Sequence, residues 1–280
     1  MAKGLRFWKM HGLGNDYIVI NNMDGRINSE TMSELAKTLC QRRYSVGADG
    51  LLFACKSEKA DIKMRIFNPD GSEAEMCGNG IRCLAKFCYE NRITKKREMA
   101  IETLAGIKRI WLYTDELGKE VKTVKVDMGE PSFEREAIPM LGKGKFIDEE
   151  LEVDGERYRA SCVSVGNPHC VIFTEEIDHV PVEEIGPKIE HHELFPKRVN
   201  VEFVQVISPK EIKIRVWERG VGETLACGTG ACASVVVSHI LGKTDKKVKV
   251  NLLGGSLEIY YDGRIFMEGP AVKVFAGKLF

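Results

Sequence analysis

The sequence predicts an α/β (α+β) protein made of two related halves, because one strand–loop–helix pattern occurs twice along the chain. In each copy a cysteine is followed by Gly-x-Gly and then by an apolar run, as in Cys77-Gly78-Asn79-Gly80 and Cys227-Gly228-Thr229-Gly230. The two lead cysteines lie 150 residues apart. A glycine-rich turn that opens onto an apolar run is typical of the start of a buried helix. Two copies at this distance indicate a duplicated domain and not a solenoid.

The repeat extends upstream of each cysteine. Arg65-Ile66-Phe67 and Arg215-Val216-Trp217 lie at the same offset of 150 residues, and their alternating apolar residues predict a strand. Each strand precedes a segment with Gly and Glu that we expect to be a loop, residues 69–76 in the first copy and 219–226 in the second. The order of strand, loop and helix is therefore the same in both halves.

The periodicity of apolar residues places the other elements. Helices are expected at residues 29–42, 80–90 and 182–189, with Asn28 or Ser29 capping the first. Strands are expected at 7–10, 18–21, 51–54, 62–68, 100–103, 108–113, 123–128, 162–165 with a resumption at 170–173, 201–207 and 212–217. The composition turns to loop near residues 129–131, which predicts domains at 1–128 and 129–272, with residues from about 273 to 280 packing back on the first.

Composition excludes several classes of protein. A chain of 280 residues suits two domains of ordinary size. The 41 basic and 41 acidic residues balance, so no electrostatic footprint for nucleic acid or a membrane surface is present. No apolar run approaches a membrane span or a signal-peptide core. Nine cysteines without a regular framework or a C-x-x-C pair favour reduced thiols in the cytoplasm and disfavour a structural zinc site.

A physical reason connects cysteine with these turns. The first N–H groups of a helix have no intrahelical partner, and the helix dipole places partial positive charge there. We therefore expect the pKa of a thiol at this position to fall below about 8.5. The same N–H groups can hold a carboxylate. Two such turns facing one substrate would let one cysteine remove a proton from a carbon while the other returns it to the opposite face.

Other polar residues occur at matching places in the two halves. Asn15 and Asn167 each follow a glycine in a turn and lie 152 residues apart, and His169 follows the second. Glu218 and Arg219 interrupt an apolar stretch before Cys227, where they could hold an ammonium and a carboxylate. Each has an ordinary structural interpretation, as a hairpin residue, a buried histidine or a surface ion pair. Buried structural roles are expected for the cysteines inside the helices: Cys83, Cys88 and Cys232.

Two glycine-rich segments raise the question of a nucleotide site. The turn at residues 11–17 lacks the third glycine and the following helix of a dinucleotide fingerprint. The segment 228–233 matches G-x-G-x-x-A, but the cysteine ahead of it and its twin copy explain it better. No pyridoxal motif is evident, and no cofactor or metal is expected.

Five motifs together resemble the diaminopimelate epimerase family over the whole chain. They are HGLGNDY at 11–17, NPDGSEAEMCGNG at 68–80, VGNPHCVIF at 165–173, RVN at 198–200 and WERGVGETLACGTGACAS at 217–234. The resemblance implies two pseudo-symmetric domains, each a mixed β-sheet curled around a central helix, with the active site in the interdomain cleft. Gly50 stands where some members carry a glutamine, so a substrate contact from that position is not carried over.

The resemblance also implies roles for individual residues. Cys77 and Cys227 would alternate as thiolate and thiol, with His169 and Glu218 assisting them. The amino and carboxylate groups of the substrate would be held by a larger set: Asn15, Asn68, Gly78, Asn79, Asn167, Asn200, Glu218, Arg219, Gly228 and Thr229. The implied reaction is the interconversion of L,L- and meso-2,6-diaminopimelate without pyridoxal phosphate, in lysine and peptidoglycan precursor biosynthesis. The expected partner is a small amino-acid substrate, and the expected assembly is a homodimer.

Alternatives remain at this stage. A racemase or epimerase of another amino acid, such as proline or hydroxyproline, would share the paired cysteines, but a substrate with one carboxylate would leave Arg219 without a partner. A thiol redox protein would turn over with reductants and would not exchange an α-proton. A non-catalytic binding protein on the same fold would not need both cysteines.

Overall fold

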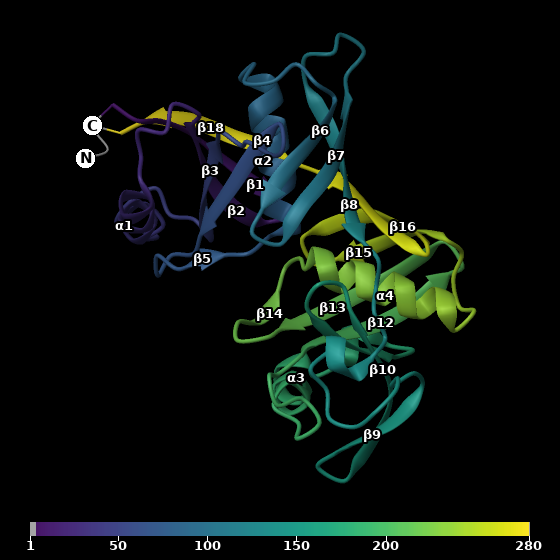
Figure 1. Cartoon of the computed structure of the whole chain (residues 1–280). Helices are drawn as coiled ribbons and strands as arrows, with labels where there is room; N and C mark the ends of the chain where they lie inside the picture. The colour runs from purple at the N-terminus through teal and green to yellow at the C-terminus, as the bar shows by residue number, and fades with distance from the viewer. Residues whose placement is uncertain (1–3, 280) are drawn as a thin grey trace. The chain divides into compact units, whose positions relative to one another are not determined.

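The computed structural model describes residues 4–279, and the chain divides into two units (Figure 1). The first unit consists of two segments, the chain up to Asp127 and the chain from Glu268 onward. The second unit is Met128–Met267. Each unit is a mixed sheet with few helices. Within residues 4–279, no helix has the length and apolar character that crossing a membrane requires.

The described part of the first unit contains two α-helices, α1 (Ser29–Leu39) and α2 (Gly78–Glu90). Its strands are β1 (Arg6–Gly12), β2 (Asn15–Asn22), β3 (Gly50–Cys55), β4 (Ile62–Phe67), β5 (Glu73–Ala74), β6 (Glu98–Thr103), β7 (Gly106–Thr114), β8 (Val121–Gly129) and β18 (Val272–Lys278). Strand β18, near the C-terminus, pairs antiparallel with β1, which in turn pairs with β2.

The second unit contains α3 (Val182–Glu190), α4 (Gly228–Ile240) and two short 3₁₀ helices, η1 (Arg135–Ala137) and η2 (Ile177–His179). Its strands are β9 (Glu149–Val153), β10 (Glu156–Ser164), β11 (Pro168–Phe173), β12 (Asn200–Ser208), β13 (Glu211–Glu218), β14 (Gly222–Thr224), β15 (Lys247–Leu252), β16 (Gly255–Asp262) and β17 (Arg264–Pro270).

The strand pairings of the two units repeat one another. In the first unit β2 pairs parallel with β3, β3 antiparallel with β4, β4 parallel with β6, and β6 antiparallel with β7. In the second unit the same sequence of pairings joins β11, β12, β13, β15 and β16. The duplication expected from the two cysteine turns is therefore present in the backbone topology as well as in the sequence.

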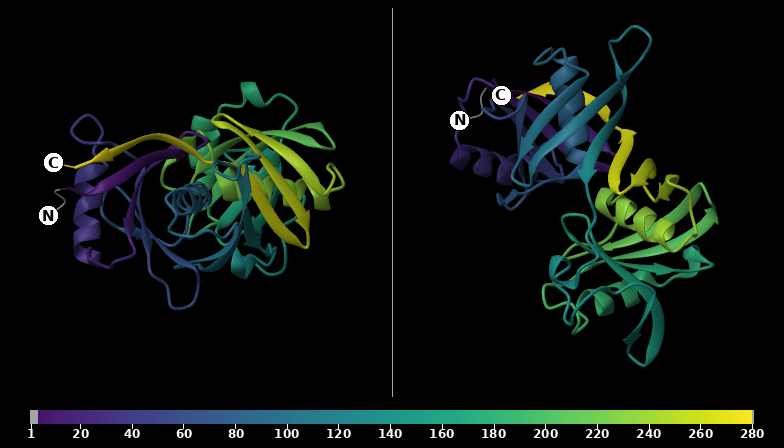
Figure 2. Two further views of the ribbon diagram at one scale, coloured as in Figure 1. Left: turned by 90° about the horizontal axis from the view of Figure 1, so that it is seen from above. Right: turned by 45° about the vertical axis from the view of Figure 1, so that its right-hand side comes forward.

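A central helix packs against several strands in each unit. Helix α2 contacts β1, β2, β3, β4 and β7, and α4 contacts β10 to β13, β15 and β16. The left view of Figure 2 looks along α2 and shows strands of its unit around it. Helix α4 carries only apolar or small residues from Gly228 to Ser238, and all of these except Thr229 are buried, as is typical of a helix that is covered on every side. Helix α2 also buries Lys86, whose ammonium donates to the Val121 carbonyl at 2.6 Å and pairs with Glu90 at 2.9 Å.

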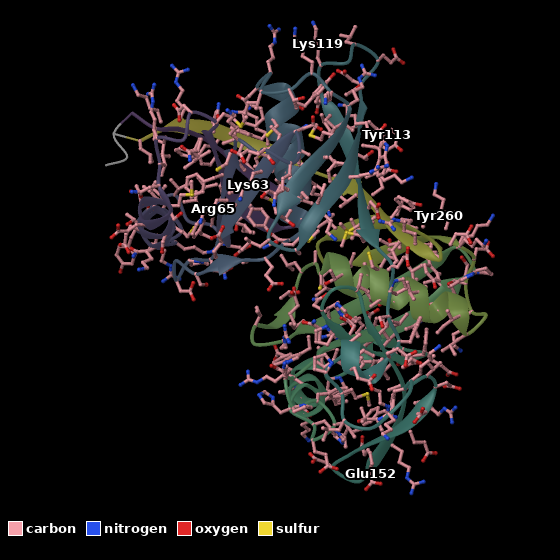
Figure 3. The ribbon with its side chains drawn as sticks, in the orientation of Figure 1. Lys63, Arg65, Tyr113, Lys119, Glu152 and Tyr260 are labelled. Atoms are coloured by element: carbon pink, nitrogen blue, oxygen red, sulfur yellow. The ribbon has the colours of Figure 1, made fainter. Side chains whose placement is uncertain are left out.

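A short hairpin precedes each central helix, where the sequence predicted only a loop. Strands β4 and β5 form the first hairpin, and β13 and β14 form the second. Arg65, labelled on β4 in Figure 3, makes a two-pronged ion pair with Glu73 at 2.7 and 2.6 Å. Arg215 pairs with Glu223 in the same way, at 2.6 and 2.9 Å. These ion pairs hold matching hairpins closed just ahead of the two cysteines.

Two further predictions were wrong in detail. The first helix ends at Leu39 and not at residue 42, because the Leu39 carbonyl accepts from the Gly47 N–H, so the chain has already turned. Its start agrees with the prediction, since Asn28 accepts from the Thr31 N–H. The segment 170–173 does not resume the strand before it. It belongs to β11, which runs antiparallel to β10 with Cys170 opposite Cys162.

Candidate active site

Cys77 and Cys227 occupy the same structural position, the N-cap of the central helix in each unit. Both have extended backbone, with φ −141° and ψ 125° at Cys77 and φ −117° and ψ 110° at Cys227. Their carbonyl groups accept the first helical hydrogen bonds, from Ile81 at 2.9 Å and Ala231 at 3.0 Å. The N–H groups that follow a helix N-cap lack partners within the helix. Residues 78–80, together with Gly228 and Thr229, therefore supply backbone donors suited to a carboxylate, whereas the Gly230 N–H donates to Sγ of Cys227.

Close packing accounts for the second glycine of each turn. A Cβ at Gly80 would lie 3.3 Å from the side chain of Leu52. A Cβ at Gly230 would lie 2.8 Å from Oε1 of Glu202 and 3.3 Å from Sγ of Cys227. Only glycine therefore lets the second turn approach the buried carboxylate this closely.

Asparagine and tyrosine side chains surround Cys77 in the first unit. Its Sγ lies 2.8 Å from the hydroxyl of Tyr17 and 3.8 Å from Oδ1 of Asn15. Nδ2 of Asn79 donates to the same Asn15 oxygen at 3.4 Å. Asn15 is held in turn by Asp49, whose Oδ2 accepts from Asn15 Nδ2 at 2.9 Å. The structure thus brings together three of the predicted site residues, Asn15, Cys77 and Asn79.

The pKa of Cys227 lies well above that of an ordinary thiol, which corrects the expectation that its helix turn lowers it. Burial is the largest cause, and the neighbouring carboxyl groups of Glu218 and Glu202 add to it. The Thr229 hydroxyl, 3.5 Å from Sγ, and the Gly230 N–H, 3.4 Å away, favour the thiolate but do not outweigh burial. Cys227 is therefore held as a thiol near neutral pH.

A continuous run of hydrogen bonds leads to Cys227 from inside the second unit. His169 is fully buried, with Nδ1 2.6 Å from Oε1 of Glu202 and Nε2 2.9 Å from Oδ1 of Asn167. Nδ2 of Asn167 donates to the Thr229 hydroxyl at 3.2 Å, and that hydroxyl contacts Cys227. Burial raises the pKa of Glu202, although His169 opposes the shift. Four predicted site residues, Asn167, His169, Cys227 and Thr229, are therefore connected in one network.

Glu218 and Arg219 lie at the turn that joins β13 to β14. The pKa of Glu218 is raised, because burial outweighs the opposing effect of the hydrogen bond that the Thr224 hydroxyl donates to the carboxylate at 2.5 Å. The backbone N–H of Arg219 donates to Oδ1 of Asn200 at 2.8 Å, and Asn200 donates to a carbonyl at the start of β11. The exposed guanidinium of Arg219 contacts the Lys197 carbonyl at 3.2 Å. Asn200 therefore fixes the backbone from which both charged side chains extend.

Asn68 is placed differently from the other predicted site residues. Its Nδ2 donates to the Ser72 hydroxyl at 3.0 Å, and its backbone N–H donates to the Ser72 carbonyl at 2.8 Å. These bonds close the tight turn between β4 and β5. Within residues 4–279 they do not join Asn68 to the hydrogen-bonded group around Cys77.

The sequence prediction missed three residues that the structure places beside the cysteines or their partners. Tyr17 contacts Cys77, Asp49 orients Asn15, and Glu202 contacts His169. Glu202 carried a signal, because it is a charged residue inside the apolar strand that begins at Asn200. Tyr17 lay within the recognised motif at 11–17 without an assigned role, and the exposed Asp49 carried no signal of its own.

Comparisons with known proteins place these features in a family. The family model described as diaminopimelate epimerase matches residues 7–134 and 161–274. A diaminopimelate epimerase of Moorella thermoacetica is 51% identical over 277 residues, covering 98% of both chains. One from Methanococcus maripaludis is 50% identical over 279 residues, covering 98% of this chain and 99% of the relative.

Solved structures with little sequence identity share the fold. A hydroxyproline epimerase from Agrobacterium vitis superposes with a TM-score of 0.72 at 14% identity, covering 99% of this chain and 92% of that one. A PhzF-family phenazine biosynthesis protein of Bacillus anthracis gives 0.71 at 19% identity, covering 99% of each chain. The fold is thus common to several groups of proteins, whereas the family model and the relatives of about 50% identity specify one of them. The chain belongs to the diaminopimelate epimerase family of isomerases.

Proposed function

We propose that this protein interconverts L,L- and meso-2,6-diaminopimelate by a cofactor-independent mechanism with two cysteine residues as acid and base. The observation that carries the proposal is the equivalent placement of Cys77 and Cys227 at the N-caps of two pseudo-symmetric helices. Relatives about 50% identical over nearly the whole chain are diaminopimelate epimerases, which supports the choice of substrate.

The chemistry begins with a proton of very low acidity, on the carbon next to a carboxylate. In the proposal, the backbone N–H groups after each cysteine bind that carboxylate and stabilise the charge that develops on it. One cysteine, as thiolate, removes the α-proton, and the other, as thiol, delivers a proton to the opposite face. The raised pKa of Cys227 makes it the proton donor of the resting enzyme, which leaves the role of base in that form to Cys77.

The other predicted residues hold the substrate or tune the cysteines in this scheme. The proposal assigns His169 and Glu218 to assist the cysteines, and the contact of Glu218 with Cys227 supports the second assignment. Arg219 offers a planar guanidinium suited to a distal carboxylate. The remaining polar contacts to the substrate are assigned to Asn15, Asn68, Gly78, Asn79, Asn167, Asn200, Gly228 and Thr229.

The test is to incubate the reduced enzyme with L,L-diaminopimelate and to follow the meso isomer by chiral chromatography. Cys77→Ser and Cys227→Ser should each lower kcat by a factor of about 10²–10⁴, the usual contribution of a positioned acid or base. Cys88→Ala is the matched control, because Cys88 is a buried cysteine further along α2. If proline or hydroxyproline is converted and diaminopimelate is not, the enzyme is a racemase or epimerase of that other amino acid. Turnover only with reductants would point to thiol redox chemistry.

The proposal also places the enzyme in the cytoplasm, where thiols stay reduced. All nine cysteines are thiols in the structure, which supports this location. A homodimer is proposed on the resemblance alone, and light scattering from the purified protein tests it directly.

A further inference from the structure

The hydroxyl of Tyr17 lies between two polar atoms of the Cys77 site. It is 2.8 Å from Sγ of Cys77, and it donates to Oδ1 of Asn15. Asn15 cannot easily turn its amide, because its Nδ2 donates to Oδ2 of Asp49 at 2.9 Å. The Asn15 oxygen is therefore kept facing the phenol as a permanent acceptor.

The phenol can act only as a neutral hydroxyl. Tyr17 is 2% exposed, and burial, reinforced by Cys77, raises its pKa well above the ordinary value. A neutral phenol has one proton to donate and lone pairs with which to accept. It therefore cannot donate to Asn15 and to Cys77 at the same time.

The repeat points to the same residue independently. Tyr17 follows Asn15 by two residues, just as His169 follows Asn167, and the two pairs are 152 residues apart. Each is the first paired residue of a parallel ladder, Tyr17 with Gly50 and His169 with Asn200. Each also bonds the asparagine of its own turn. Tyr17 is therefore the structural counterpart of a predicted site histidine.

We propose that Tyr17 is a positioning residue for Cys77 whose hydroxyl reverses its hydrogen bond as the cysteine changes protonation state. When Cys77 is a thiol, its S–H donates to the Tyr17 oxygen and the phenol donates to Asn15. When Cys77 is a thiolate, the phenolic O–H rotates and donates to Sγ. The proton remains on Tyr17 throughout, and no bond is broken. The consequence for catalysis rests on the proposed function, whereas the hydrogen bond itself does not.

The other groups around this site do not substitute for the phenol. Arg82 and Cys83 of α2 and Asp49 before β3 are the neighbouring titratable or charged groups. Burial raises the pKa of Cys83 to about 12, so it remains a neutral thiol. Arg82 donates to Oδ1 of Asn79 at 2.7 Å, and Asp49 accepts from Asn15. Among the described groups of the first unit, the hydroxyl of Tyr17 is therefore the one best placed to respond to the state of Cys77.

The test measures how fast Cys77 reacts with iodoacetamide as a function of pH, with the modified peptide quantified by mass spectrometry. Tyr17→Phe removes only the hydroxyl, and the midpoint of the Cys77 profile should rise by about one pH unit, because a thiolate loses a charge-assisted hydrogen bond. Tyr89→Phe is the matched control, since it removes a phenol that bonds the Gly118 carbonyl from the far end of α2. An unchanged or lower midpoint in Tyr17→Phe, or an equal rise in both variants, would overturn the proposal.

A second variant shifts the midpoint in the opposite direction and does not depend on Tyr17→Phe folding. Asn15→Ala removes the competing acceptor, so the phenol should donate continuously to Cys77 and the midpoint should fall. The fall should vanish in the double variant with Tyr17→Phe. An unchanged or higher midpoint in Asn15→Ala contradicts the proposal, as does a fall of the same size without the phenol.

These measurements use no substrate, so their outcome is separate from that of the diaminopimelate assay. An enzyme that converts another amino acid would leave the alkylation result intact. If both the proposed function and the inference hold, the lower limb of the pH profile of kcat/KM should shift upwards in Tyr17→Phe by the same amount as the alkylation midpoint.

Discussion

Replacing Asp16 by asparagine should destabilise the first unit in a pH-dependent manner. Asp16 lies between Asn15 and Tyr17, and its carboxylate contacts Arg42 at 2.6 Å and Lys9 at 2.5 Å with its side chain 15% exposed. Burial by itself would raise its pKa, but the bonds from Arg42, Lys9 and Asp49 outweigh burial and lower it from 3.8 to about 2. At about 1.36 kcal/mol per pKa unit, the charged form contributes on the order of 2 kcal/mol to the free energy of unfolding.

The direction of the pH effect follows from the sign of the shift. Because the folded pKa lies below the unfolded one, the contribution is present above the unfolded value of 3.8 and is lost as the pH falls through about 2. Urea unfolding of wild type and Asp16→Asn should differ by about 2 kcal/mol above about pH 5, and by about half of that near pH 3.

Asp24→Asn is the control for Asp16→Asn. Asp24 pairs with Arg26 on the surface, at side-chain exposures of 54% and 84%, so its loss should cost less than about 0.5 kcal/mol. The reasoning fails if Asp16→Asn costs no more than this control, or if its cost is the same at pH 3 as at pH 7. Hydrogen exchange along β2 would show whether the loss is centred on the strand that carries Tyr17.

Three further predictions concern the surroundings of Cys227. Gly230→Ala should lower the unfolding free energy by about 1–3 kcal/mol in thermal denaturation, because its Cβ would lie 2.8 Å from the buried Glu202; an unchanged Tm would contradict the packing argument. Glu218→Gln should move the alkylation midpoint of Cys227 to lower pH, since the carboxylate raises the pKa of the thiol. The control Glu223→Gln alters the ion pair with Arg215 and should leave this midpoint unchanged. Thr229→Val should move the same midpoint to higher pH, because the hydroxyl favours the thiolate; a shift in the other direction would exclude this hydrogen bond.

The repeat made much of the architecture predictable from the sequence. Residues 150 positions apart, such as Cys77 and Cys227, occupy equivalent positions because each glycine-rich turn leads directly into the central helix of its unit. Apolar periodicity located strands such as β4 and β13 to within a residue or two. The short partner strands β5 and β14 were missed, because two or three residues are too few to show a period.

The electrostatics of the site could not be predicted in the same way. A helix N-terminus favours a thiolate, but the pKa of Cys227 is set by what packs around it, and burial beside Glu218 and Glu202 reverses the expected direction. Glu202 lies on β12, 25 residues before Cys227 in the sequence, and comes close to it because α4, which Cys227 caps, packs against β12. Contacts of this kind depend on tertiary packing, which a local motif does not contain.

The most direct test of the two-cysteine mechanism follows the α-hydrogen itself. The reduced enzyme is incubated with L,L-diaminopimelate in deuterated water, and early samples of substrate and product are separated and measured by NMR. The mechanism predicts deuterium at the inverted carbon of the meso product and little in the recovered L,L substrate, because different groups remove and return the hydrogen. Cys77→Ser and Cys227→Ser should both fail to complete the inversion. A persistent α-proton signal with active wild-type enzyme, or equal labelling of substrate and product from the start, would contradict it.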